Sequence, residues 1–183
     1  MKVIFLDIDG VLNVKNWHEK KRHSFIDKDK AKLLAKLIKE TKSKVILSSS
    51  WRVPYFDKMV SNAAGNVISE AHRIFKKYKI PVVDKTPFCK TREDEIISKI
   101  VEYDLDSYVV FDDKPLDLPN AIQTNQDVGL TEKDIEKALE ILSYPSYSTL
   151  EEIKKIKAEK ECYDFLNKYG VFVNPAKQQI QGQ

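Results

Sequence analysis

Short apolar runs alternate along this chain with longer segments in which apolar residues recur every three or four positions. The short runs are almost wholly apolar, which is typical of strands that a parallel sheet buries on both faces. The pattern predicts strands over residues 3–6, 44–47, 80–83, 108–111 and 121–124.

The longer segments each carry one apolar face and predict amphipathic helices. These helices are expected over residues 29–40, 67–78, 91–101, 131–142 and 149–169. Thr131 has the character of an N-cap, with Asp134 near the positive end of its helix. Strands that alternate with helices imply right-handed crossovers and a parallel sheet. We therefore expect an α/β fold, a three-layer Rossmann-like sheet with helices on both faces.

The run from Tyr144 to Tyr147 interrupts this alternation. A chain of 183 residues, 42% hydrophobic and 32% charged, suits one globular domain with a small appendage. We expect a domain over residues 1–145 and a C-terminal helical extension over residues 146–183.

Composition narrows the functional classes only slightly. The net charge of +3 is a small difference between 31 basic and 28 acidic residues, so it neither requires nor excludes a nucleic-acid partner. Cys89 and Cys162 are too few and too far apart for a disulfide framework or a zinc site. With no leader-like segment and no apolar run long enough for a bilayer, we expect a cytoplasmic protein without a membrane partner.

Polar side chains follow three of the predicted strands. Asp7 and Asp9 follow the first, the serines of residues 48–50 follow the second, and Asp112 and Asp113 follow the fourth. The carboxyl ends of parallel strands meet at one edge of a sheet, where ligands of such folds bind. Converging carboxylates repel one another unless a cation is present, and an all-oxygen ligand set suits Mg²⁺. The pattern indicates an enzyme with a magnesium site at this edge.

The run FLDIDGVL, from Phe5 to Leu12, resembles the first motif of the haloacid dehalogenase superfamily of phosphotransferases. The order of strands and motifs extends the resemblance over residues 1–143. It implies that Asp7 is a nucleophile that forms an aspartyl-phosphate. It also implies that Asp9 is the general acid and then the base. An acid at this second position is typical of the phosphatases and mutases of the superfamily, and not of its dehalogenases or pumps.

The second motif of that superfamily supplies a hydroxyl that binds the phosphoryl group. The Ser-Ser-Trp-Arg ending resembles small domains of the superfamily, including some from RNA-repair proteins, and it selects Ser49, with Ser48 as the alternative. Trp51 and Arg52 are expected to buttress the site.

The third motif is a basic residue, for which the resemblance favours Arg92. Arg92-x-x-Glu95-Ile96 is similar to an Arg-Gly-x-Glu-Ile pattern of those small domains, although Glu93 stands in place of the Gly. Lys90 is a competing candidate.

The fourth motif of the superfamily matches the acid pair that follows the fourth strand. By this resemblance Asp112 ligates Mg²⁺ directly, and Asp113 does so directly or through water. The carboxylate of Asp7 and the backbone carbonyl of Asp9 would complete the ligand set.

No folded cap is expected over the site, because residues 10–29 and 53–66 are too few to form one. An open site admits a large substrate end. Trp17 either stacks on a base or packs under its loop, and Lys20, Lys21 and Arg22 are placed to contact phosphates.

The leading hypothesis is a phosphomonoesterase that acts on a nucleotide or a nucleic-acid end, and the runner-up is a phosphatase of sugar phosphates or other small metabolites. A phosphoacceptor signalling module is disfavoured, because its acid pair would lie on the first strand and its acceptor on the third. A silent binding domain has no need of the complete set Asp7, Asp9, Asp112 and Arg92.

Overall fold

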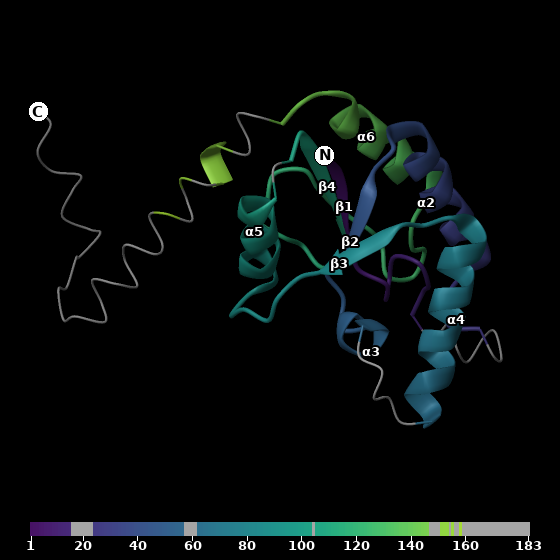
Figure 1. Ribbon diagram of the computed structural model, residues 1–183. Coiled ribbons are helices and arrows are strands. Elements are labelled where there is room, and N and C mark those ends of the chain that lie inside the picture. Colours follow the sequence, from purple (N-terminus) through teal and green to yellow (C-terminus); the bar gives the residue numbers. More distant parts are fainter. Residues whose placement is uncertain are drawn as a thin grey trace, which may run out of the picture.

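The computed structural model of the protein (Figure 1) contains one sheet with helices packed against both of its faces. It describes residues 1–15, 24–56, 62–103, 105–146, 151–153, 155 and 158.

The sheet has five strands, all parallel, in the order β3-β2-β1-β4-β5. Their bounds are β1 Lys2–Leu6, β2 Lys44–Leu47, β3 Val82–Lys85, β4 Ser107–Asp112 and β5 Ala121–Gln123. β1 lies at the centre, with β2 and β4 on either side, so the chain segments that follow these three strands leave the sheet next to one another. The predicted parallel α/β fold is confirmed.

Helices cover the two faces of the sheet unequally. The described helices are α2 Lys28–Thr41, α3 Arg52–Phe56, α4 Asn62–Tyr78, α5 Arg92–Glu102 and α6 Glu132–Ser143. α2, α4 and α6 lie on one face, and α5 lies on the other (Figure 1). α3 and the first half of α4 extend past the edge at which the strands end.

Alternate residues of the central strands supply two separate cores, as the twofold side-chain period of a strand requires. Ile4 and Leu6 of β1 point into the larger core, beneath α2, α4 and α6. Val3 and Phe5 point into the smaller core, beneath α5. Ile153, in the helical residues 151–153 that follow α6 along the chain, is fully buried in this smaller core.

The N-cap predicted from sequence is present. The Thr131 hydroxyl accepts a hydrogen bond from the Asp134 N–H, and the Asp134 carboxylate accepts one from the Thr131 N–H, so the two residues form a capping box.

The third strand begins two residues later than we predicted. Ile80 lies in the turn that ends α4, because its N–H donates to the Phe75 carbonyl and Lys79 before it adopts a left-handed φ of 55°. Pro81 has no N–H to contribute to a ladder, and the strand starts at Val82. The apolar run predicted a strand here but not the residue at which the strand begins.

The stretch 53–66 is also more regular than we expected, since it contains most of α3 and the start of α4. The loop of residues 16–23 lies outside the described residues, as does most of the predicted helix 149–169, of which residues 151–153 are helical. The domain boundary at residue 145 stays a prediction.

Candidate active site

Asp7 is held in place by contacts to both neighbouring strands. Its N–H donates to the Phe111 carbonyl of β4 over 2.9 Å, and its side chain accepts a hydrogen bond from the Ile8 N–H over 2.7 Å. The side chain of Ser49, which follows β2, faces the same carboxylate and lowers the pKa of Asp7. Only 6% of Asp7 is exposed, so its carboxylate lies at the bottom of the site.

Gly10 allows the loop after β1 to pass close to the loop after β4. It has a φ of +73°, and a Cβ at this position would lie 2.6 Å from the Asp113 Cβ. Its carbonyl accepts a hydrogen bond of 2.8 Å from the Thr124 hydroxyl. Both the backbone conformation and the close approach require glycine here, and they bring the two acidic loops together.

Three carboxylates form an acidic cluster. Asp7, Asp112 and Asp113 each present an oxygen within 4.8 Å of the others. Burial, and then the charge of Asp112, raise the pKa of Asp7 to about 6, and burial also raises the pKa of Asp112. One oxygen of Asp112, Oδ2, is buried and accepts no hydrogen bond from the described residues.

These observations fit a magnesium ion, which takes hard oxygen ligands and offsets the repulsion of clustered acids. The orphaned Asp112 oxygen, which would otherwise be costly to bury, is a free ligand atom. The other oxygen of Asp112 accepts a hydrogen bond of 3.0 Å from the Lys114 N–H, which fixes the carboxylate.

Asp9 has a different environment, because its side chain is exposed beside the cluster. One carboxylate oxygen accepts a hydrogen bond from the Asn13 amide and the other accepts one from the Trp51 indole N–H, both over 2.9 Å. Trp51 therefore buttresses the site, as expected.

Asn13 was missed by the sequence analysis. Besides its bond to Asp9, its side-chain oxygen accepts a hydrogen bond from the Gly10 N–H over 2.9 Å. The signal was its spacing, since an amide four residues beyond an acid in a tight loop is placed to fold back on it.

Of the two candidate serines, Ser49 lies against Asp7. Its hydroxyl faces the Asp7 carboxylate, whose pKa it lowers, and accepts a hydrogen bond from the Trp51 N–H over 3.3 Å. The Ser48 hydroxyl is fully buried and has no hydrogen-bond partner among the described residues. The geometry favours Ser49 as the phosphate-binding hydroxyl.

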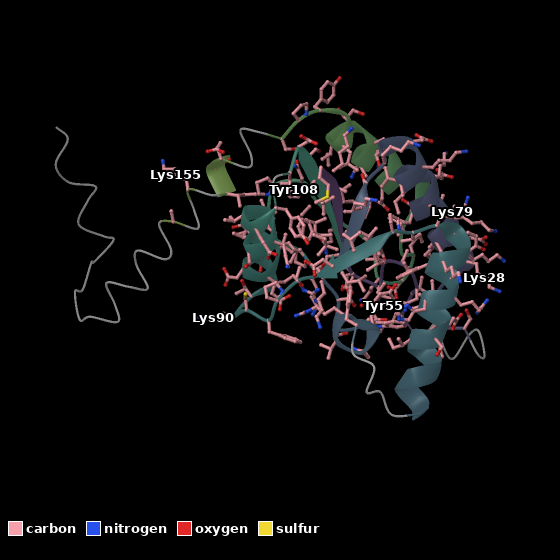
Figure 2. The ribbon with its side chains drawn as sticks, viewed as in Figure 1. Lys28, Tyr55, Lys79, Lys90, Tyr108 and Lys155 are labelled. Carbon is pink, nitrogen blue, oxygen red and sulfur yellow. The ribbon has the colours of Figure 1, made fainter. Side chains whose placement is uncertain are left out.

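Of the two basic candidates, only Arg92 approaches the acids. Its Nε lies 3.8 Å from Glu95 Oε2 and 3.9 Å from Asp112 Oδ2, while its Nη1 is buried without a hydrogen bond from the described residues. Lys90 is exposed in the loop at the start of α5 (Figure 2). A guanidinium with a free donor at the edge of the cluster suits an incoming phosphoryl oxygen.

Arg52 and Glu95 form a buried ion pair of 2.6 Å beside the acidic cluster. The pair contacts both the loop that carries Ser49 and the side chain of Arg92. Arg52 also donates to the Ser49 carbonyl over 3.0 Å, and its guanidinium stacks 4.3 Å from the centre of the Phe88 ring. Glu95 thus links the serine loop to Arg92. Sequence reasoning placed Arg52 as a buttress but did not identify Glu95 as its partner.

The fold is that of the haloacid dehalogenase (HAD) superfamily, whose members are mostly phosphatases and other hydrolases. Such domains typically use Mg²⁺, in agreement with the acidic cluster. Within that class, the family of the HAD domain in Swiss Army Knife RNA repair proteins matches residues 3–135, and the chain belongs to it.

No curated protein and no solved structure matches the chain significantly. Within the described part of the chain, no helix combines the length and the apolar character needed to cross a membrane.

Proposed function

We propose that the protein is a Mg²⁺-dependent phosphomonoesterase that acts on nucleotides or nucleic-acid ends through an aspartyl-phosphate. The observation that supports this most is the contrast between two acids of one loop. Asp7 is buried against Ser49 and the acidic cluster, as a nucleophile must be, while Asp9 stands exposed between two hydrogen-bond donors.

In the first half of the reaction, an Asp7 carboxylate oxygen attacks the phosphorus atom. The bond between phosphorus and the ester oxygen breaks, and the leaving oxygen takes a proton from Asp9, so that the product is an alcohol. The Ser49 hydroxyl and the free N–H of Arg92 donate to the phosphoryl oxygens, on which negative charge accumulates.

In the second half, Asp9 is a carboxylate and takes a proton from a water molecule. The water oxygen bonds to phosphorus, the bond between phosphorus and Asp7 breaks, and inorganic phosphate leaves. Asp9 ends protonated and Asp7 ends as a carboxylate, so both side chains return to their starting states.

The acidic cluster would hold the metal through Asp7, Asp112 and Asp113. When bound, Mg²⁺ offsets the negative charges of these acids and of the phosphoryl group, which otherwise repel one another.

The proposed substrate class rests on the family and on the form of the site. The family is described as a domain of RNA repair proteins, and a phosphorylated nucleic-acid end is a substrate class that suits this description. Near the site, Phe88 is 74% exposed on top of Arg52, so one face of its ring is free to stack on a base.

A panel of phosphomonoesters tests the proposal. With Mg²⁺, we expect release of phosphate from 3′- or 5′-phosphorylated oligonucleotides with a higher kcat/KM than from sugar phosphates, and no release by Asp7→Asn. Preference for a sugar phosphate would establish the small-metabolite alternative. Turnover by the Asp7→Asn variant would exclude the covalent mechanism.

A further inference from the structure

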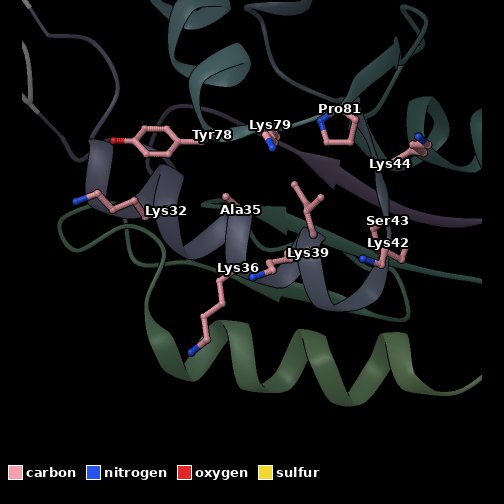
Figure 3. A pocket seen from close by; sticks show the side chains of 11 residues that line it. Lys32, Ala35, Lys36, Lys39, Lys42, Ser43, Lys44, Tyr78, Lys79 and Pro81 are labelled. Atoms are coloured by element: carbon pink, nitrogen blue, oxygen red, sulfur yellow. The ribbon is translucent and has the colours of Figure 1, made fainter.

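A groove of about 640 Å³ lies away from the active site, between α2, the end of α4 and the start of β2 (Figure 3). Lysines line it on several sides, together with Tyr78 and Pro81. The six lysines are Lys32, Lys36, Lys39, Lys42, Lys44 and Lys79, all of them exposed.

The groove carries an uncompensated positive charge. None of its lining residues is acidic. Lys32 and Lys36 contact the carboxylates of Asp29 and Glu132, but these pairs are exposed and therefore weak. For the other four lysines, the described residues supply no ion pair. The ammonium groups of these four lysines repel one another, and an anion in the groove would relieve that repulsion.

Helix dipoles account for only part of this arrangement. Lys39 and Lys42 lie at the C-terminal end of α2, and Lys79 directly follows α4. At such helix ends a cation stabilises the negative end of the helix dipole by about 0.3–1 kcal/mol. Lys32 lies in the first half of α2, and Lys44 begins a strand. Neither gains from a helix C-terminus, yet both line the same groove.

We propose that this groove binds a single-stranded nucleic acid along its phosphodiester backbone. Lys32 and Lys42 are ten residues apart on one helix, so the lysines extend over about 15 Å, longer than a single phosphate group. The half-buried Tyr78 adds an aromatic ring on which a base can stack. None of the large exposed apolar side chains lines the groove, which argues against a lipid surface as the partner.

The groove is separate from the proposed reaction. It lies where β2 begins, whereas Ser49 lies just beyond the point where β2 ends. Lys44 and Ser49 are five residues apart along an extended chain, which corresponds to about 16 Å. The groove therefore holds nucleic acid remote from the reacting phosphate, and binding there does not require turnover at Asp7.

Fluorescence anisotropy with a labelled single-stranded RNA of about 20 nucleotides tests this in the Asp7→Asn background, where no turnover interferes. The groove variant combines Lys39→Gln, Lys44→Gln and Lys79→Asn, the last because asparagine tolerates the left-handed backbone at residue 79. At about 100 mM salt we expect Kd to rise at least about tenfold. The slope of log K against log salt should become shallower by about 2 for three lost contacts.

The matched control replaces Lys133, Lys137 and Lys155 by Gln, which removes the same charge from exposed positions outside the groove. We expect this control to keep most of the affinity. If the groove variant does not fold, Lys39→Gln alone should give about a third of the slope change. Unchanged RNA binding by the groove variant, or an equal loss in the control, would overturn the proposal. So would loss of binding to phosphatidylserine vesicles without loss of binding to RNA.

Discussion

Asp7 and Asp9 are two residues apart but have opposite environments, and Ile8 between them explains why. Ile8 is 1% exposed and packs in the larger core, so it anchors the loop directly after β1. Its N–H is also bonded to the Asp7 side chain. Asp7 is thereby held against the acidic cluster, while the chain beyond Ile8 turns and leaves Asp9 exposed.

The indole of Trp51 is expected to position Asp9 for proton transfer. Trp51→Phe keeps the ring but removes the N–H that bonds to the Asp9 carboxylate over 2.9 Å. Poor orientation of Asp9 should slow the reaction most for an ester whose leaving oxygen must be protonated, such as an alkyl phosphate. We therefore expect kcat for an alkyl phosphate to fall about tenfold, and kcat for p-nitrophenyl phosphate to fall less than about twofold. Steady-state kinetics with both esters measure the difference.

Trp51→His serves as the partner variant, because its ring can still offer an N–H toward Asp9 and should restore part of the alkyl phosphate activity. An equal loss on both esters would mean that Trp51 only supports the fold.

At the scale of elements, the unequal covering of the sheet stands out. Three helices pack on one face, while the described residues place only α5 and the segment around Ile153 on the other. Ile153 is fully buried among side chains such as Val110 and Tyr108, although it lies beyond the family match, which ends at residue 135. Ile153 thus contributes to the core on the α5 face of the sheet.

Ile153→Ala should therefore destabilise the whole domain. Removing a fully buried isoleucine side chain costs both its transfer free energy and the energy of the cavity left behind, together about 3 kcal/mol. Urea unfolding followed by fluorescence measures this change. Lys155→Ala, at an exposed neighbouring position, should alter the unfolding free energy by less than about 0.5 kcal/mol. A similarly small effect of Ile153→Ala would mean that the segment does not pack on the sheet in solution.

Sequence patterns were sufficient for those elements whose signals are local. The apolar runs identified β1, β2 and β4, and the Thr131 cap identified the start of α6, because burial and capping leave a mark on the residues themselves. α3 was missed, since it has only five residues and contains a proline, so no helical period can be seen.

The candidate site also contains residues that the sequence could indicate and residues that only the structure could identify. Asp7, Asp112 and the serines could be placed at one edge of the sheet because they follow apolar runs, whereas the preference for Ser49 over Ser48 came from the family resemblance. The choice of Arg92 over Lys90 needed three-dimensional information, as did the link from Arg52 to Glu95 across 43 residues. Contacts between distant side chains leave no periodic trace in the sequence.

For the whole molecule, the acidic cluster should make stability depend on pH when no metal is present. The pKa of Asp7 is raised from 3.8 to about 6 in the folded protein, mainly by burial. The folded state then binds more protons than the unfolded state between these values, so the unfolding free energy falls as pH rises from about 4 to about 6. A difference of about 2 pKa units corresponds to on the order of 3 kcal/mol by pH 7.

Urea unfolding of metal-free protein at several pH values measures this decline. Asp7→Asn should remove most of it and be the more stable protein at pH 7, and added Mg²⁺ should stabilise the wild type more than the variant. Asp117→Asn, at an exposed loop position, should keep the full decline. Identical pH profiles of the unfolding free energy for wild type and Asp7→Asn would show that the pKa of Asp7 is not raised in the folded protein.

All five strands run in the same direction, so the sheet has two chemically unlike rims. One rim carries the loops after Leu6, Leu47 and Asp112, with acids, hydroxyls and a tight glycine. The other carries the turns into the strands, where lysines gather near Lys44. Mutations in one set of loops leave the other set untouched. A protein engineer can therefore replace the turns near Lys44 without changing the loops that carry Asp7, Ser49 and Asp112.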